Sequence, residues 1–388
     1  MCPSIRTLRL LLALALVLVT PLVSTSVGAL PGPGDRAASP AGLDQFIETR
    51  MRAAHLPGMQ AVIVKGGRVV WEGAYGYANV EAQKRVSPET LFMLASISKT
   101  VTATALVQLA DAGRLDLDAD ISALLPYPVV HPNAPTVPIT ARHLLTHTAG
   151  IEDNWTYLSY HPGDCPIPLG FFCAEYFTFG GRFHNVNANW HPTAPGTAFS
   201  YSNAGFAMVG NLVQAAAFMD FEDYCQANIF APLGMHEASF RISKLDPTHV
   251  AHPYIWNGAG YVDQGFYGYP DYPDGTLRTS ATQLARFAMA HMAGGGPLLS
   301  PVAAADMKRV QLPSVEPTQG LGFYYDYKPG RPAPLRLGHN GGDAGVQTDL
   351  WMCPWDDQTA VIVLANGDSG YQEQAEIIDR LFAEARGL

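Results

Sequence analysis

Basic residues are scarce in this chain of 388 residues, which has 24 Lys and Arg against 34 Asp and Glu. The formal net charge is −10, and it would be −12 for a chain that starts at residue 30. Nucleic acids and anionic membrane surfaces attract a basic face, so this composition argues against both as partners. Hydrophobic residues make up 48% of the chain, which is typical of a globular protein.

Several motifs are also missing. No Gly-x-Ser-x-Gly segment occurs, which argues against an esterase of the α/β-hydrolase type. The glycine patterns of dinucleotide and nucleotide-triphosphate sites do not occur either. His143 and His147 have the spacing of two zinc ligands on a helix, but Leu-Leu-Thr stands between them and no Glu. We therefore interpret this pair as structural and expect no metal or other cofactor.

Apart from one segment, the sequence has no long apolar run. That segment, LLLALALVLVTPLV at 10–23, follows Arg6 and Arg9 and precedes Val27 and Ala29, which are small residues at −3 and −1 of a cleavage site. We predict that residues 1–29 are a signal peptide, with an uncleaved anchor as the alternative. The mature protein is then periplasmic or secreted, and it does not contact a membrane after cleavage.

Cysteine is rare, with five in the chain, and Cys2 lies in the predicted signal peptide. Export permits disulfides. Cys165 and Cys173 enclose a short loop and form a candidate disulfide. The alternative is that these two, together with Cys225 and Cys353, are unpaired thiols.

Strand patterns occur near both ends of the chain, whereas helical patterns dominate the middle. After a Pro/Gly/Ser linker at 30–40, residues 41–388 form one domain with a mainly helical insertion at about 115–250. This order predicts an α+β fold, in which terminal helices cover one antiparallel sheet built from both chain ends. Helices are expected at 41–54, before Gly113, at 140–147, at 203–218 and at 371–386; strands within 61–81, 348–354 and 359–368; and a long loop at 151–200.

The stretch LASISKTVTATALVQLADAGRL at 94–115 contains Ser96, Ser98 and Lys99. Residues three apart share a helix face, so Lys99 can reach Ser96 but not Ser98. A serine is a weak nucleophile until a base takes its proton, and a lysine is a base only when its pKa falls. Burial and a helix N-terminus both lower the pKa of a lysine. The alternative is an ordinary first turn of a helix.

Two later triplets complete a pattern. The motifs Ser96-x-x-Lys99, Tyr201-Ser202-Asn203 and His339-Asn340-Gly341 occur in the order used by the serine β-lactamase and penicillin-binding-protein superfamily, which this chain resembles. The resemblance is to the class C-like branch and covers roughly residues 41–388. Further similar segments are LLTHTAGI at 144–151, DGTLRTSATQLARF at 274–287 and GLGF at 320–323.

Each triplet has a second match in the chain. Tyr77-Ala78-Asn79 also reads Tyr-x-Asn, but it precedes the serine and lies in a strand pattern, where packing is the simpler explanation. His161-Pro162-Gly163 also reads His-x-Gly, but its proline lacks a backbone donor and favours a turn. The third motif has to offer a strand edge, so we prefer the triplet that begins at His339.

The resemblance implies roles for these residues. Ser96 attacks an acyl carbonyl, and Lys99 and Tyr201 share the proton transfers. Asn203 holds Lys99 and a substrate amide oxygen. The backbone N–H groups of Ser96 and Gly342 form the oxyanion hole.

At the third motif the chain departs from the β-lactamase pattern of lysine followed by a hydroxyl residue. His339, Asn340 and Gly341 would line the substrate side, and we expect His339 to be only partly charged near neutral pH. Recognition of an anionic β-lactam is therefore in question. Aromatic residues at 253–273 either wall the pocket or pack a surface loop.

The resemblance implies a hydrolase that acts through an acyl-enzyme on a small-molecule or peptide substrate. The leading interpretations are a D-amino-acid peptidase similar to D-Ala-D-Ala carboxypeptidases and a carboxylesterase. The alternatives are a β-lactamase and a penicillin-binding sensor domain that is acylated without turnover. The sequence leaves the oligomeric state open.

Overall fold

The computed structural model describes residues 39–327, 336–353, 355 and 358–388. The predicted signal peptide and all but the last two residues of the predicted linker lie outside this part. The helices are α1 Leu43–Ala53, α2 Ser98–Asp111, α3 Ala141–Leu145, α4 Leu169–Phe177, α5 Asn203–Ala217, α6 Phe221–Cys225, α7 Ala231–Leu233, α8 Ala281–Met292, α9 Pro301–Lys308 and α10 Tyr371–Ala385. The strands are β1 Gly58–Lys65, β2 Arg68–Asn79, β3 Lys84–Arg85, β4 Phe92–Met93, β5 His161–Pro162, β6 Tyr254–Trp256, β7 Tyr261–Asp263, β8 Tyr267–Gly268, β9 Arg278–Thr279, β10 Tyr324–Asp326, β11 Arg336–Asp343, β12 Val346–Cys353 and β13 Thr359–Ala365.

The main sheet has the strand order β10-β11-β12-β13-β1-β2-β3. Every neighbouring pair is antiparallel. The two ends of the chain meet in its centre, where β1 pairs with β13 and Met59 lies opposite Ala365. The predicted α+β fold with one antiparallel sheet is therefore confirmed.

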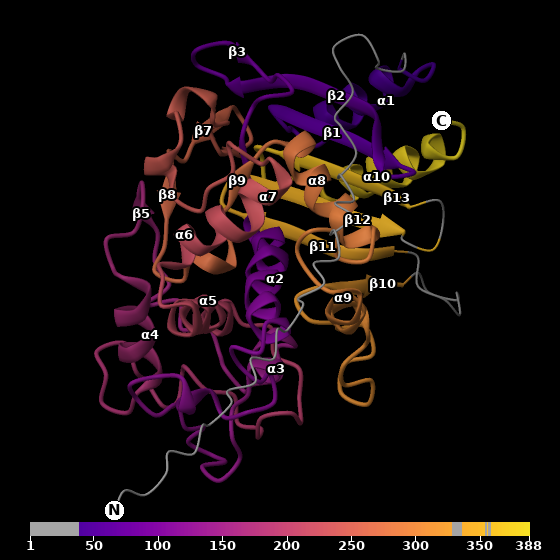
Figure 1. Cartoon of the computed structure of the whole chain (residues 1–388). Coiled ribbons are helices and arrows are strands. Elements are labelled where there is room, and N and C mark those ends of the chain that lie inside the picture. Colours follow the sequence, from indigo (N-terminus) through magenta and orange to yellow (C-terminus); the bar gives the residue numbers. More distant parts are fainter. Residues whose placement is uncertain (1–38, 328–335, 354, 356–357) are drawn as a thin grey trace, which may run out of the picture.

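Strands β1 and β13 are buried along nearly their whole length because both faces of the sheet are covered. Successive residues of a strand point to opposite faces. Val62 and Val64 of β1 join the large core cluster, while Ala61 and Ile63 join a smaller cluster with residues of α1 and α10. Helices α1 and α10 pack together on that second face (Figure 1).

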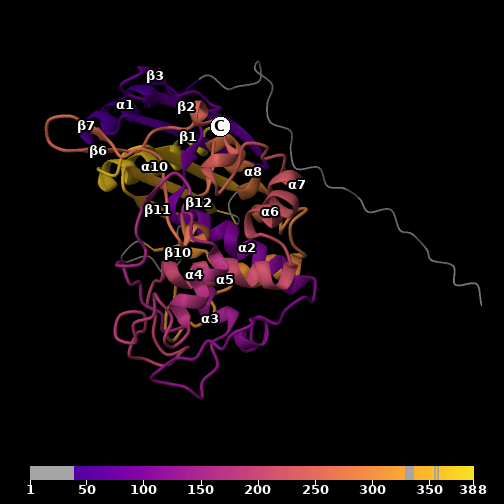
Figure 2. The same ribbon diagram turned by 90° about the vertical axis from the view of Figure 1, so that its left-hand side faces the viewer.

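Helix α2 lies between the sheet and the helical half of the molecule. Eleven of its residues are buried, from Ser98 to Leu109, which fits a helix surrounded by protein. Helices α3, α4 and α5 lie on the side of α2 away from β1 and β2 (Figures 1 and 2). Among the described residues, no single helix has the length and apolarity to cross a membrane, although α5 and the segment Phe221–Leu233, bent by 76°, pass that test as a pair.

The segment 151–200 is not entirely the predicted loop. It contains α4, whose residues Phe172, Cys173, Tyr176 and Phe177 are buried. Nearly every position of LGFFCAEYF is apolar or aromatic, so the sequence shows no clear helical periodicity. The helical conformation of α4 is therefore determined by its packing against the rest of the protein.

The structure also corrects the candidate disulfide, because Cys165 and Cys173 are both free thiols. Cys173 points from α4 into the large core cluster and is fully buried. Cys165 is only partly buried, on the loop before α4, and bonds to the backbone of Ile167. The two side chains thus occupy different environments.

We expect Ile362→Ala to destabilise the fold by about 2–5 kcal/mol, because Ile362 is fully buried in the large core cluster and truncation leaves a cavity. Urea unfolding followed by circular dichroism measures this change. The control is Val302→Ala on α9, where the side chain is 80% exposed and the expected change is within about 0.5 kcal/mol. Similar losses for both variants would contradict the assigned core.

Candidate active site

A strained turn presents Ser96 where β4 leads into α2. Ala95 has φ of 47°, a left-handed conformation that costs a non-glycine residue about 1–3 kcal/mol. Residues Ala95–Ile97 then form a short 3₁₀ turn, and α2 begins at Ser98. Strain of this kind is found at functional sites, where surrounding structure holds it in place.

The two serines differ in their surroundings. Ser98 is fully buried, and its Oγ accepts a hydrogen bond from the Leu277 N–H at 3.1 Å. Ser96 Oγ instead lies 2.8 Å from Tyr201 Oη and 3.2 Å from Lys99 Nζ. The structure therefore brings together Ser96, Lys99 and Tyr201 and leaves Ser98 in a structural bond.

Lys99 is fully buried at the centre of the site. Its Nζ donates to Asn203 Oδ1 at 2.7 Å, to the Asp274 backbone oxygen at 3.1 Å and to Asp274 Oδ2 at 3.0 Å. A buried ammonium costs several kcal/mol unless it is paired and hydrogen-bonded. Asp274 supplies this pairing. The sequence analysis missed its role, although Asp274 begins one of the segments that carry the family resemblance.

The charge state of Lys99 corrects an expectation from the sequence. Burial does lower the pKa of Lys99, but Asp274 and Tyr201 raise it by more, so the net shift is upward. Burial raises the pKa of Tyr201, and Lys99 opposes this shift. Both groups therefore hold their protons at neutral pH, and Lys99 is an ammonium in the resting site.

The second motif is fixed at the start of α5. Asp153 Oδ1 accepts from Ser202 Oγ at 3.0 Å and from the Ala204 N–H at 3.0 Å, while its Oδ2 accepts from the Asn203 N–H at 2.9 Å. A carboxylate at a helix N-terminus satisfies free backbone donors and complements the helix dipole. Asp153 thereby holds Tyr201 and Asn203 in place. No sequence signal singled out this residue, which is 50 positions from its partners.

His147 supports Tyr201 from behind. Its Nδ1 accepts from the Ser202 N–H at 3.1 Å, and its ring stacks on the Tyr201 ring with centroids 4.3 Å apart. Burial lowers the pKa of His147 well below the usual value, with Lys99 adding to the shift. His147 is therefore a neutral positioning residue.

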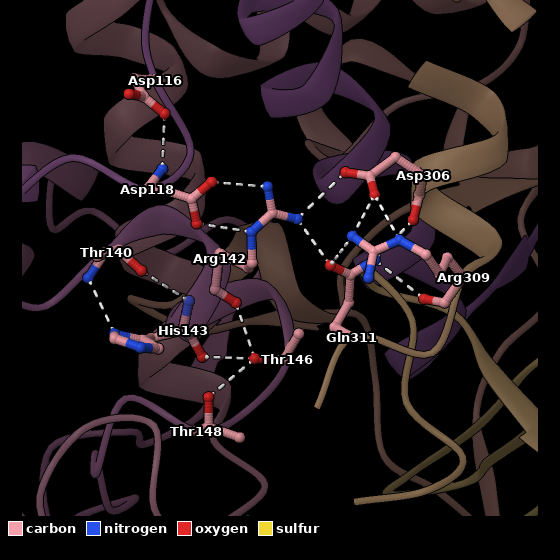
Figure 3. Close-up of polar contacts among 10 residues, drawn as sticks. All are labelled: Asp116, Asp118, Thr140, Arg142, His143, Thr146, Thr148, Asp306, Arg309 and Gln311. Atoms are coloured by element: carbon pink, nitrogen blue, oxygen red, sulfur yellow. Dashed lines mark hydrogen bonds and ion pairs between the residues drawn. The ribbon is translucent and has the colours of Figure 1, made fainter. Parts of the chain in front are cut away.

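His143 and its neighbours hold α3 in place through hydrogen bonds and ion pairs (Figure 3). The Thr140 N–H donates to His143 Nδ1 at 3.3 Å, and Thr140 Oγ1 accepts from the His143 N–H. Next to it, Arg142 bridges Asp118 at 2.7 Å and Asp306 at 3.1 Å. In the described part of the chain, no group of three or more His, Cys, Asp or Glu is arranged to hold a metal ion.

The third motif lies on β11, which passes beside Ser96. Strand β10 pairs only with Arg336–Gly338, so it does not cover the edge of β11 from His339 onward. A Cβ on Gly341 would lie 3.0 Å from the Ser96 nitrogen and closer still to the Leu94 carbonyl oxygen. Glycine at this position thus permits the close approach that sets Gly342 beside Ser96.

His339 does not carry the partial charge expected from the sequence. It is 3% exposed, and burial, reinforced by Lys99, lowers the pKa of His339 to about 3. The side chain is therefore neutral at physiological pH. Asn340 Oδ1 accepts from Tyr324 Oη at 2.8 Å, so this amide is held in place as well.

The other Tyr-x-Asn and His-x-Gly triplets, which begin at Tyr77 and His161, form contacts elsewhere in the fold. The Arg85 guanidinium lies over the Tyr77 ring at 4.8 Å, and Asn79 Oδ1 accepts from the Ala82 N–H at 2.7 Å. His161–Pro162 form β5, which pairs with β8.

Two cavities meet at Ser96, and Ser96 and Gly342 line both of them. The first cavity, of about 480 Å³, is lined by Asn203, Tyr160 and several carboxyl groups. The other, of about 420 Å³, contains Tyr201 and His339. Ile255, Tyr269 and Asp271 of the aromatic run 253–273 line the first cavity, so part of this run forms the pocket wall. The arrangement offers a nucleophile, a proton-transfer pair and two sides for a substrate.

The sequence matches the family described as Beta-lactamase over residues 43–385. The chain belongs to the serine β-lactamase and penicillin-binding-protein superfamily. Protein flp of Staphylococcus aureus (strain MRSA252) is 28% identical over 249 residues, which are 62% of this chain and 46% of that protein. The chain thus spans about half the length of the curated relatives it matches.

Solved structures agree with this assignment. The octameric penicillin-binding protein homologue from Pyrococcus abyssi superimposes with a TM-score of 0.73 at 26% identity, covering 90% of this chain and 77% of that one. SurE with D-Leu superimposes with a TM-score of 0.66 at 26% identity, covering 89% and 75%.

The pairing of Lys99 with Asp274 predicts a pH dependence. Because Lys99 and Tyr201 both hold protons at neutral pH, the rate at which a fluorophosphonate labels Ser96 should rise as pH increases above neutral. Asp274→Asn removes the carboxylate that raises the pKa of Lys99. The labelling rate of this variant should therefore rise at a lower pH than that of the wild type. Mass spectrometry of the adduct across a pH series measures both curves.

Asp223→Asn is the matched control, since Asp223 pairs with Lys244 on an exposed surface. Its curve should coincide with the wild-type curve. A curve for Asp274→Asn that is unshifted or shifted to higher pH would contradict the assigned role of this ion pair.

Proposed function

We propose that the protein is an exported serine hydrolase that forms an acyl-enzyme on Ser96 with amide or ester substrates. The observation that carries this proposal is the convergence of Tyr201 Oη, at 2.8 Å, and Lys99 Nζ, at 3.2 Å, on Ser96 Oγ. Family membership supports it. Export follows from the predicted signal peptide alone.

In the acylation step, Ser96 Oγ bonds to the substrate carbonyl carbon while its proton passes to the Tyr201–Lys99 pair. The reactive form of this pair lacks one proton, and the Lys99 ammonium stabilises negative charge on the Tyr201 oxygen. In this proposal the backbone N–H groups of Ser96 and Gly342 stabilise the oxyanion. Tyr201 then gives the proton to the departing amine or alcohol.

In the deacylation step, water occupies the position of the departed group. Tyr201 accepts a proton from this water, which attacks the ester carbonyl, and Ser96 Oγ leaves and regains a proton. Asn203 keeps Lys99 in place in both steps through its 2.7 Å hydrogen bond. The same groups thus serve both half-reactions in reverse order.

The charge at the third motif bears on the substrate. His339 is neutral, and no lysine or arginine is among the described residues that line the cavity containing Tyr201. A substrate carboxylate on this side has no cation to bind, which argues against a β-lactam and against a peptide with a free C-terminus. We therefore favour a D-amino-acid peptidase acting on uncharged leaving groups or a carboxylesterase. The D-Leu in the SurE structure supports the first.

The first experiment identifies the nucleophile. After reaction with a fluorophosphonate, intact-mass and peptide mass spectrometry of the wild type should find one adduct on Ser96. Ser96→Ala should form no adduct, while Ser98→Ala should keep it. An adduct on Ser98, or none on the wild type, would overturn the mechanism.

The second experiment compares substrates side by side. Wild-type kcat/KM should be higher for a short-chain 4-nitrophenyl ester or a D-aminoacyl anilide than for nitrocefin, because His339 offers no positive charge to the nitrocefin carboxylate. All turnover should disappear in Ser96→Ala. Faster hydrolysis of nitrocefin would favour the β-lactamase alternative, and acylation without turnover would favour the sensor domain.

A further inference from the structure

The larger of the two cavities at Ser96 is acidic. Four carboxyl side chains line it, those of Asp271, Asp274, Asp343 and Asp368. No lysine, arginine or histidine is among the described residues that line this cavity. Lys99 lies behind it, but its ammonium is held by Asp274 and Asn203. The cavity wall therefore carries acidic groups and no basic ones.

Two of these carboxyl groups each have a buried oxygen without a hydrogen-bond partner. Asp271 is only 3% exposed, and its Oδ1 has no hydrogen-bond partner. Asp274 Oδ1 is buried and without a partner as well. Buried polar atoms are nearly always hydrogen-bonded, and one left unpaired costs about 1–3 kcal/mol. Such an acceptor at the wall of a cavity is free to accept a hydrogen bond from a bound ligand.

An ammonium group is the donor that the electrostatics of this cavity favour. Burial and the carboxyl groups of Asp274 and Asp153 raise the pKa of Asp271 well above its usual value. Burial raises the pKa of Asp343 too. Like charges in a confined space disfavour ionisation, and an ammonium placed among them relieves this repulsion.

Aromatic rings complete the cavity. Tyr160, Tyr269 and Trp155 line it, and Trp155 is 67% exposed. Tyr160 Oη lies 2.5 Å from Asp343 Oδ1, which fixes that ring and that carboxyl group together. Aromatic faces beside carboxylates are a recurring arrangement for binding ammonium groups.

The catalytic geometry assigns this cavity to one part of the substrate. Tyr201 gives its proton to the departing group, and Tyr201 lines the other cavity. The departing group therefore occupies that side, and the acyl part extends into the acidic cavity. We propose that this cavity binds an ammonium group on the acyl part, so that the preferred substrates are aminoacyl amides or esters with a free amine. This inference rests on the proposed function.

The test uses two isosteric inhibitors of Ser96-dependent 4-nitrophenyl acetate hydrolysis. Alaninamide, in D and L forms separately, carries an ammonium where isobutyramide carries a methyl group. At about pH 6.5 the amine is protonated. The inhibition constant of at least one alaninamide enantiomer should be roughly tenfold or more below that of isobutyramide. For each variant we take the ratio of the isobutyramide inhibition constant to the alaninamide inhibition constant. A general loss of activity affects both constants alike and leaves this ratio unchanged.

The ratio should fall towards one in Asp271→Asn and in Asp343→Asn, which preserve side-chain shape, and should persist in the charge control Asp223→Asn. Equal constants in the wild type would overturn this inference alone. A preference that survives in both cavity variants would also overturn it. A wild type without Ser96-dependent hydrolysis would instead overturn the proposed function, and this inference with it.

Discussion

The buried ammonium of Lys99 is the constraint on which the site depends. A fully buried cation is tolerated only when acceptors surround it, and these come from three distant parts of the sequence: Ser96 before α2, Asn203 at the start of α5, and Asp274. The ion pair with Asp274 stabilises the buried ammonium and also keeps Lys99 protonated. In the proposed mechanism, Lys99 therefore acts first as a fixed positive charge, and the proton transfers depend on its coupling to Tyr201.

The fold brings those segments together by pairing the two ends of the chain. Because β1 joins β13, the C-terminal strands form one continuous sheet with the N-terminal ones, and β11 lies next to the turn that carries Ser96. Gly341 allows the two backbones to approach closely. Asp153 fixes the start of α5 from the opposite side. Lys99 thus lies on α2, whereas Ser96 and Tyr201 lie in the segments that lead into α2 and α5.

The sequence predicted the parts of this arrangement that follow from local rules. Helical spacing alone separated Ser96 from Ser98, and the strand patterns at 61–81, 348–354 and 359–368 correspond to β1, β2, β12 and β13 of the seven-stranded sheet. The resemblance supplied the two later motifs in their order. What could not be predicted depends on spatial neighbours. The raised pKa of Lys99 depends on Asp274, which is 175 positions away, and the lowered pKa of His339 depends on its burial.

The structural misses have related causes. Helix α4 is apolar on nearly every side, so no periodicity marks it, and only its burial in the helical half reveals why it forms. Cys165 and Cys173 are close in sequence, yet α4 turns one of them into the core. Spacing in the chain sets an upper limit on separation but says nothing about the direction of a side chain.

The distribution of charge then explains how this site can differ from that of a β-lactamase while it keeps the same reacting groups. Since Asp274 pairs with Lys99 and His339 is uncharged, the acidic groups beside the nucleophile are those of Asp271, Asp343 and their neighbours. In the proposed function these groups favour a substrate amine over a substrate carboxylate. The proposed choice of substrate thus depends on the carboxyl groups around Ser96, whereas the proposed chemistry depends on Ser96, Lys99 and Tyr201.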